Sequence, residues 1–456
     1  MPISVACRSC GKRLRAPDHM AGRAVKCPFC FSSILVAPAS ADAGAYALKE
    51  EPPSRPPAPP PPEDEFDEPE IVAPRLSKPA TRLDPDPAES LPPLGTNEPP
   101  VWLRHLHWLL LLALIPLGFS LLKHDDEKDF EKRLIETIQK APEGDRLRIA
   151  ATIEEMEEGN GSLDDLFQAL PGHKLVGAFL SRSSFLHWGF ALMAAILFMT
   201  FFLILGSHET ANPLHLLGIG LFTATIGIIF LLIVQFLGEA SAGGGWIHGR
   251  GIMAIILIIL KIIGYSYRAA SDPDSNFFLS FIGYTLGVGF CEEVCKALPL
   301  LFLYRRGTDQ TWRGAFVWGL ASGAGFGISE GIMYSGSFYN GISGPDIYAV
   351  RFISCVALHA LWTGTAAIII HRKQELLQAQ MEWYEYFVPL MIFIGVPMVL
   401  HGLYDTMLKK SMEPVALAVA LASFLFLAFQ ISRLHSADED QATSKMLQEY
   451  RRRRMT

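Results

Sequence analysis

The sequence predicts an all-α polytopic membrane protein of about eight to nine transmembrane helices, with a small N-terminal zinc ribbon. Three observations support this fold class: two closely spaced cysteine pairs within the first 30 residues, a Pro-rich acidic stretch after them, and long apolar segments from residue 101 onward. Hydrophobic residues make up 50% of the 456-residue chain and charged residues 19%, although the polar first hundred residues dilute a very apolar remainder. Apolar stretches of about 20 residues are typical of helices that cross a bilayer.

The cysteines of residues 1–38 have the spacing of a structural zinc site. Cys7 and Cys10 form one Cys-x-x-Cys pair, and Cys27 and Cys30 form a second. Each such turn presents two thiolates to one side, so two turns complete a closed four-thiolate site with no open position for catalysis. The alternative is a free redox pair. We expect structural zinc in a folding or docking module that recruits a protein partner.

Residues 39–100 form the next region, which is rich in Pro, Ala, Glu and Asp and includes seven residues, 56–62, of which six are proline. Such a segment cannot bury enough apolar surface to fold, and its prolines favour extended polyproline II structure. The sequence therefore predicts a disordered linker that tethers the ribbon to the membrane.

Nine apolar segments follow, each tested against the roughly 20 residues needed to cross about 30 Å of hydrocarbon. They are 103–122, 184–206, 213–237, 250–266, 277–303, 313–335, 348–370, 386–408 and 413–431. The fourth segment is short and carries Lys261, so it is the least secure. We assign 101–123 as the first transmembrane helix, 183–270 as further membrane helices, and 271–432 as the core that carries the polar residues described below.

Two charged regions flank these segments. In residues 124–182, Phe130, Leu134 and Ile138 repeat at helical spacing, which predicts a small helical soluble domain. Residues 433–456 form a charged tail that ends in a run of four arginines followed by Met and Thr. The net charge of −7 excludes a general nucleic-acid-binding role, because phosphate neutralisation requires a basic face.

The distribution of basic residues conflicts with nine crossings. Arg305 follows the fifth segment, Arg372 follows the seventh, and 451–454 follow the ninth, so the positive-inside rule places all three in the cytoplasm. Nine crossings would then leave the ribbon outside, whereas free thiolates suit a reducing compartment. Either one segment does not cross fully, with 250–266 the first candidate, or one of these two rules fails here. We expect a multi-pass protein of the bacterial inner (cytoplasmic) membrane.

Charged side chains inside the fifth apolar segment are the first sign of a functional site. An ionisable group at bilayer depth costs about 2.5–3.5 kcal/mol on insertion scales. Glu292 and Glu293 lie four and three residues before Lys296, so on a helix the ammonium group reaches either carboxylate. A salt bridge that merely tolerates buried charge is the simpler interpretation. However, Lys296 can neutralise only one of the two carboxylates. The other lies in a low dielectric beside a like charge, which favours a group that takes up and returns a proton.

The next three segments add further polar residues. Glu330 lies in a glycine-rich stretch of the sixth, His359 lies in the seventh, and His401 and Asp405 share one helical face in the eighth. Glu330 could instead extend to the interface, and a single His in an apolar helix is more often a packing residue. Two histidines, each with an acid nearby, favour a site.

The order of these motifs resembles the PrsW family of intramembrane proteases, which is related to the CAAX-processing and bacteriocin-protection proteases. The motifs are EExxK, Phe-Gly-x-x-Glu with a Tyr four residues on, His-Ala-x-Trp-Thr and His-Gly-x-x-Asp, within about 275–410. One departure is Gly331, where the family often has Asn. The resemblance implies these functional residues: Glu292, Glu293, Lys296, Glu330, His359, His401 and Asp405.

The resemblance implies hydrolysis of peptide bonds in membrane-anchored protein substrates. A glutamate, with Glu293 preferred over Glu292, would deprotonate a water molecule, and His359 and His401 would stabilise the oxyanion. A metal-dependent form is equally compatible, because His and carboxylates are normal zinc ligands. The alternatives are an ion-coupled transporter, although no internal repeat is evident, and a catalytically inactive receptor with the ribbon as docking module.

Overall fold

The computed structural model describes residues 3–6, 13–16, 24–26, 33–35 and 101–455, except for 123–129, 207–211, 244–250, 309 and 379–382. The chain divides into two compact units, Met1–Ser90 and Leu91–Thr456.

The first unit contains two antiparallel hairpins. Strand β1 (Ile3–Ala6) pairs with β2 (Arg13–Ala16), and β3 (Ala24–Lys26) pairs with β4 (Ser33–Leu35). In the sequence, one cysteine pair falls between the strands of each hairpin, but Cys7, Cys10, Cys27 and Cys30 lie outside the described residues. The zinc ribbon, and the linker 39–100, therefore stay predictions.

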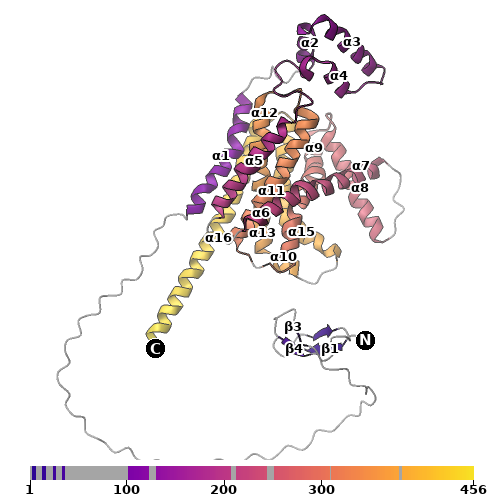
Figure 1. Cartoon of the computed structure of the whole chain (residues 1–456). Coiled ribbons are helices and arrows are strands. Elements are labelled where there is room, and N and C mark those ends of the chain that lie inside the picture. The colour runs from indigo at the N-terminus through magenta and orange to yellow at the C-terminus, as the bar shows by residue number, and fades with distance from the viewer. Residues whose placement is uncertain are drawn as a thin grey trace, which may run out of the picture. The chain divides into compact units, whose positions relative to one another are not determined.

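The second unit is helical throughout its described residues, and its longest helices run alongside one another (Figure 1). Its α-helices are α1 (Val101–Leu122), α2 (Phe130–Lys140), α3 (Glu143–Glu157), α4 (Leu163–Ala169), α5 (Leu186–Leu205), α6 (Pro213–Phe222), α7 (Ile228–Gly243), α8 (Ile252–Ser271), α9 (Phe277–Gly283), α10 (Phe290–Arg305), α11 (Trp312–Tyr334), α12 (Pro345–Ala349), α13 (Val356–Arg372), α14 (Glu375–Gln378), α15 (Phe387–Lys409) and α16 (Glu413–Met455). Four wider π-helical turns continue these helices, at η4 (Thr223–Gly227), η5 (Tyr284–Gly289), η6 (Ser335–Tyr339) and η7 (Val350–Cys355). Two short 3-10 turns are η3 (Pro171–His173) and η8 (Trp383–Tyr386).

Each of the nine predicted apolar segments lies on a helix of this unit. Among the described residues, six helical stretches are long and apolar enough to cross a membrane: Leu186–Leu205, Pro213–Gly243, Met253–Ser271, Pro345–Arg372, Phe387–Lys409 and Glu413–Asp438. The chain is an integral multi-pass membrane protein. The predicted total of eight to nine crossings includes three further helices: α1, whose apolar part is shorter, α9–α10, which carries buried charges, and the glycine-rich α11.

Glycines bring α11 into close contact with α13. Gly319, Gly323 and Gly327 recur every four residues on one face of α11. A methyl group added at Gly323 would lie 2.2 Å from the backbone oxygen of His359, and one at Gly327 would lie 2.9 Å from His359 Cδ2. Small residues of this kind let membrane helices pack closely. This packing places Glu330, one turn further along α11, beside the His359 ring.

A second pair of glycines joins the α9–α10 stretch to α15. A methyl group at Gly289 would lie 2.8 Å from the Met398 oxygen, and one at Gly402 would lie 2.4 Å from Thr285 Oγ1. The turn of α10 after Gly289 therefore faces the middle of α15. That contact brings the paired glutamates of α10 next to His401.

Helices α2 to α4 form a small group with its own core, which includes Ile149, Phe167 and Leu170. The segment that follows it is bonded to the α11–α12 connection: the backbone N–H of Leu175 donates to the Gly341 oxygen at 2.8 Å, and that of Gly341 donates to the Leu180 oxygen at 2.9 Å. The predicted helices of 124–182 are thus present from residue 130 onward. That they form a soluble domain stays a prediction.

Candidate functional site

The seven predicted side chains meet in one network between α10, α11, α13 and α15. All are buried or largely buried inside the helix bundle. Helix α10 contributes three of them, α11 and α13 one each, and α15 two; in chain order they are Glu292, Glu293, Lys296, Glu330, His359, His401 and Asp405.

Lys296 lies at the centre of the network and is fully buried. Its Nζ donates to Glu293 Oε1 at 2.8 Å and to Glu292 Oε2 at 3.2 Å, and it lies 2.7 Å from His359 Nδ1. The ammonium also lies 4.5 Å from the centre of the Phe326 ring, a cation–π contact. One cation therefore partly neutralises two carboxylates and orders one imidazole.

His359 joins Lys296 to a second ion pair. Its Nε2 lies 2.7 Å from Glu330 Oε2, while the other Glu330 oxygen accepts a hydrogen bond from Arg351 at 3.1 Å. The Arg351 guanidinium lies 3.9 Å from the centre of the Tyr334 ring. Both ring nitrogens of His359 thus have polar partners, one on each side.

His401 completes the network on α15. Its Nδ1 lies 3.1 Å from Glu293 Oε1, and its Nε2 lies 3.4 Å from Asp405 Oδ2 and 3.7 Å from Glu292 Oε2. The ring stacks on Trp362 of α13, with centroids 4.4 Å apart and planes at 21°. This stacking fixes the plane of the imidazole, so both nitrogens point at carboxylates.

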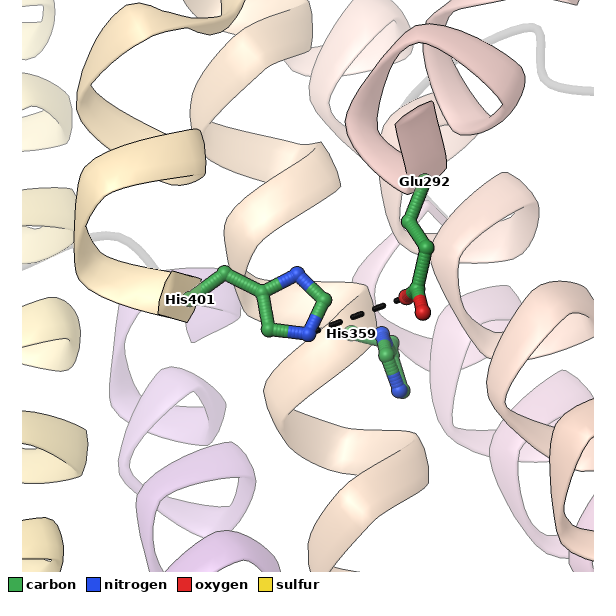
Figure 2. A group of neighbouring side chains, drawn as sticks. All are labelled: Glu292, His359 and His401. Carbon is green, nitrogen blue, oxygen red and sulfur yellow. Dashed lines mark ion pairs between the residues drawn. The ribbon is translucent and has the colours of Figure 1, made fainter. Parts of the chain in front are cut away.

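Three of these side chains have the composition of a metal site. Ligand atoms of Glu292, His359 and His401 lie within 4.8 Å of one another, and all three residues are buried. Figure 2 shows them pointing toward one another from three helices, with a dashed line between His401 and Glu292. Two imidazoles and one carboxylate are the protein ligands of several catalytic zinc sites, which keep a fourth position for water.

The fit to a metal ion is good in donor type and spacing, but it has one requirement. In this structure Lys296 and Glu330 occupy the two nitrogens of His359. His359 would therefore exchange one of these partners for the ion. Glu293 stays outside the ligand set, and its Oε2 is buried without a hydrogen-bond partner among the described residues.

The structure addresses the simpler interpretations of these residues. The EExxK side chains do form a salt bridge, but Glu293 and Glu292 also contact His401. Glu330 does not extend to the interface, because its side chain is only 13% exposed and is bonded to Arg351. At the departure from the family motif, a methyl group on Gly331 would lie 3.0 Å from the Phe352 ring, so glycine makes room for that ring.

Arg351 is the residue that sequence reasoning missed. It lies in η7, inside the seventh predicted segment, and its side chain is 12% exposed. An arginine within an apolar segment carries the same energetic cost that identified the glutamates. Applying that test to every charged residue of the nine segments would have found it.

The comparisons with known proteins agree with this geometry. Residues 246–431 match the family model described as PrsW family intramembrane metalloprotease. The searches of curated proteins and of solved structures gave no match. The matched residues contain all seven predicted side chains and Arg351, and a match to a peptidase family favours a protease over the transporter alternative. Residues 246–431 of this multi-pass membrane protein are thus a PrsW family intramembrane metalloprotease domain, and the chain is an intramembrane peptidase.

Proposed function

We propose that the network of α10, α11, α13 and α15 is the active site, and that it hydrolyses peptide bonds of membrane-anchored protein substrates in or next to the bilayer. The observation that carries this proposal is the convergence of Glu292, His359 and His401 beside Glu293, whose Oε2 is buried and free of hydrogen bonds in the described part of the chain. A buried carboxylate oxygen with no partner is costly unless it has a use.

Glu292, His359 and His401 are the residues that would hold a metal ion, most simply zinc. Such an ion, when bound, supplies a Lewis acid and makes a bound water molecule easier to deprotonate. The chain's own residues do the rest. Lys296 and His401 hold Glu293 Oε1 at 2.8 Å and 3.1 Å, so that Oε2 remains available to accept a proton.

In the proposed reaction, Glu293 takes a proton from water as the water oxygen bonds to the carbonyl carbon of the scissile peptide. The ammonium of Lys296 supplies positive charge close to the oxygen that becomes negative. Glu293 then gives the proton to the leaving amine nitrogen as the carbon–nitrogen bond breaks. Asp405 and Glu330 orient the rings of His401 and His359.

Substrates can be found by comparing the membrane proteins of cells that express the wild-type chain or its Glu293→Gln variant. We expect fragments of a membrane-anchored protein only with the wild type, and we expect the purified Glu293→Gln protein to cleave that substrate at least about 100-fold more slowly. His359→Ala and His401→Ala should lose both cleavage and one metal ion per chain by elemental analysis, whereas Glu293→Gln should keep the ion. Wild-type cleavage by Glu293→Gln would overturn the proposed role of this residue.

We also propose that the N-terminal hairpins form a zinc ribbon that docks a protein partner. The supporting observation is the position of one cysteine pair between the strands of each hairpin. The Cys27→Ser, Cys30→Ser double variant should contain one zinc ion fewer than the wild type and keep its core metal. An unchanged zinc content would contradict the ribbon.

A further inference from the structure

An apolar cavity of about 660 Å³ lies between α8, α10 and α15. Ile259, Leu298, Leu301, Leu390 and Phe393 are among its lining residues. Phe302 and Phe387 also line it, and these side chains are 55% and 49% exposed, so the cavity opens on the outside of the bundle. In a membrane protein that outer surface faces lipid.

Two arginines lie at the end of α10 beside this cavity. The guanidinium of Arg305, itself a lining residue, lies 4.8 Å from the centre of the Tyr386 ring, and that of Arg306 lies 4.1 Å from the centre of the Phe302 ring. Both rings line the cavity. Within the described residues neither arginine is paired with a carboxylate. Both guanidinium groups are therefore available to an anion at the mouth of the cavity, where the cavity opens on the outside of the bundle.

The position of this mouth in the bundle favours a lipid headgroup. Tyr304 OH lies 3.0 Å from His371 Nδ1, so the end of α10 lies beside the end of α13 with its basic Arg372 and Lys373. This is the end that the positive-inside rule places in the cytoplasm. The cytoplasmic leaflet carries anionic lipids, and basic pockets between helices on that side bind their headgroups.

We propose that this cavity binds an anionic phospholipid, with an acyl chain between α8, α10 and α15 and the phosphate on Arg305 and Arg306. Two guanidinium groups recognise a phosphate. An apolar slot that opens to the bilayer takes an acyl chain, whose burial contributes about 0.8 kcal/mol per CH₂ group. The walls Leu298 and Leu301 lie within two turns of Lys296, so the lipid fills the space between the helices that carry the paired glutamates and His401.

Native mass spectrometry of the full-length protein with added phosphatidylglycerol or phosphatidylcholine tests this proposal without any activity measurement. We expect the wild type to retain phosphatidylglycerol selectively, and the Arg305→Gln, Arg306→Gln double variant to bind it about 10- to 30-fold more weakly. Leu390→Trp, which fills the cavity but keeps both arginines, should also lose the lipid. Arg433→Gln is the matched control, because Arg433 is exposed, lies 5.7 Å from the Phe429 ring centre and does not line this cavity.

Equal retention of phosphatidylglycerol by the double variant and by Arg433→Gln would overturn the proposal. Displacement of the lipid by millimolar inorganic phosphate alone would also overturn it, because it would show a phosphate site that does not use the cavity. Since the readout is lipid binding, a failure here is distinct from a failure of the proposed protease mechanism.

A second inference concerns the number of crossings, and it starts from where α6 and α8 begin. The His215 ring of α6 lies 6.3 Å from Trp318, in the second turn of α11, and Ile255 of α8 lines the same cavity as Arg305. Helix α10 ends and α11 begins at this end of the bundle. The far end of α8 is held at the opposite end, where Lys409 Nζ donates to the Ala270 oxygen at 2.6 Å.

The α6–α7 stretch and α8 therefore both start at the end of the bundle where α10 ends. Between its ends, this stretch contacts two other helices: Thr223 Oγ1 lies 2.8 Å from Ser322 Oγ in the middle of α11, and a methyl group at Gly238 would lie 3.2 Å from Gly264 N, in the second half of α8. We infer that α6–α7 enters the membrane without crossing it, and that α8 crosses. The predicted segment that does not cross is thus 213–237 rather than 250–266, and residue 101 lies on the side of Arg305.

Labelling with a membrane-impermeant thiol reagent tests this topology. In a chain whose four N-terminal cysteines are Ser, with the buried Cys291, Cys295 and Cys355 as background, single cysteines replace Glu98, Thr308 or Asn160. We expect Glu98→Cys and Thr308→Cys to react from the same side and Asn160→Cys from the other. Reaction of Asn160→Cys and Thr308→Cys from one side, with Glu98→Cys reacting from the other, would show nine crossings and contradict the inference.

Discussion

Two Glu–Lys pairs of identical spacing lie in opposite surroundings in this molecule. In the membrane core, Lys296 Nζ lies 3.2 Å from Glu292, and the two side chains are 0% and 6% exposed. In α2, Lys140 Nζ lies 2.5 Å from Glu136, with side chains 62% and 43% exposed. The exposed pair is the closer one, yet an exposed pair contributes little to stability, whereas removing one partner of a buried pair leaves an uncompensated charge.

Substitution of Lys296 by Met should have the largest effect. Two buried carboxylates would lose their cation, which costs about 3–5 kcal/mol and leaves His359 without its Nδ1 partner. We expect the variant to be folded poorly or to melt well below the wild type, with no proteolysis. Thermal unfolding of the detergent-purified protein, followed by circular dichroism, measures the effect.

The matched control is Lys140→Met, for which we expect the melting temperature and activity of the wild type. If Lys296→Met and Lys140→Met had the same melting temperature, the burial of a Glu–Lys pair would not determine how much the pair stabilises the fold. That result would contradict the contrast drawn between the two pairs.

Glycine substitutions extend the comparison from charge to packing. In Gly327→Ala, the new methyl group would lie 2.9 Å from His359 Cδ2 and displace the ring, and a displacement of about 1 Å at an active site can cost about 100-fold in rate. Gly144→Ala in α3 meets no atom within 4 Å and favours the helix, so it should keep full activity. Steady-state cleavage of one substrate by both variants tests this; equal rates would mean that the α11–α13 contact does not position His359.

The site residues could be predicted because charge inside an apolar segment is conspicuous in a sequence. Glu292, Glu293 and Lys296 stand out at helical spacing, and the ordered motifs on four segments supplied Glu330, His359, His401 and Asp405. Their mutual contacts could not be predicted. Helix spacing determines which residues of α10 share a face, but the approach of α11 to α13 depends on glycines whose partners lie on another helix.

The crossing pattern shows a different limit of sequence reasoning. The segment 213–237 is long and apolar, and 250–266 is short and carries Lys261, so hydropathy alone selects 250–266 as the segment that does not cross, whereas the inference from the helix contacts selects 213–237. What distinguishes them is which neighbours each end contacts. The approach of His215 to Trp318, and the cavity that Ile255 and Arg305 both line, are tertiary features that no local pattern reveals.

The buried Arg351 has an exposed counterpart in Arg148 of α3, which also forms an ion pair with a carboxylate. Arg148 Nη2 lies 2.8 Å from Asp145 Oδ1, and its side chain is 59% exposed. Because Arg351 acts on the His359 ring through Glu330, we regard it as a positioning residue. We expect Arg351→Gln to lower kcat about tenfold with KM almost unchanged, Arg351→Lys to recover part of the loss, and Arg148→Gln to behave as the wild type. A change in KM alone would assign Arg351 to substrate binding instead.

The smallest effect on stability is expected from a change of pH at the start of α4, where Ser162 and Asp165 form a capping box. The Ser162 hydroxyl, 2.6 Å from Asp165 Oδ2, and the Ser162 backbone N–H, 2.9 Å away, lower the pKa of the Asp165 carboxyl. A carboxyl whose pKa is depressed by folding stabilises the helix above its unfolded pKa of about 3.9, and this contribution is lost as the pH falls through the folded pKa.

Hydrogen exchange of the α4 amides, corrected for the intrinsic effect of pH, measures this contribution. We expect protection to be constant between about pH 7 and pH 5 and to fall about fivefold at lower pH, whereas Asp165→Asn should give a weaker protection that does not change over this range. At neutral pH, Asp165→Asn should leave the peptidase core folded, because the capping box lies outside it. A pH profile of Asp165→Asn identical to that of the wild type would show that another group controls α4.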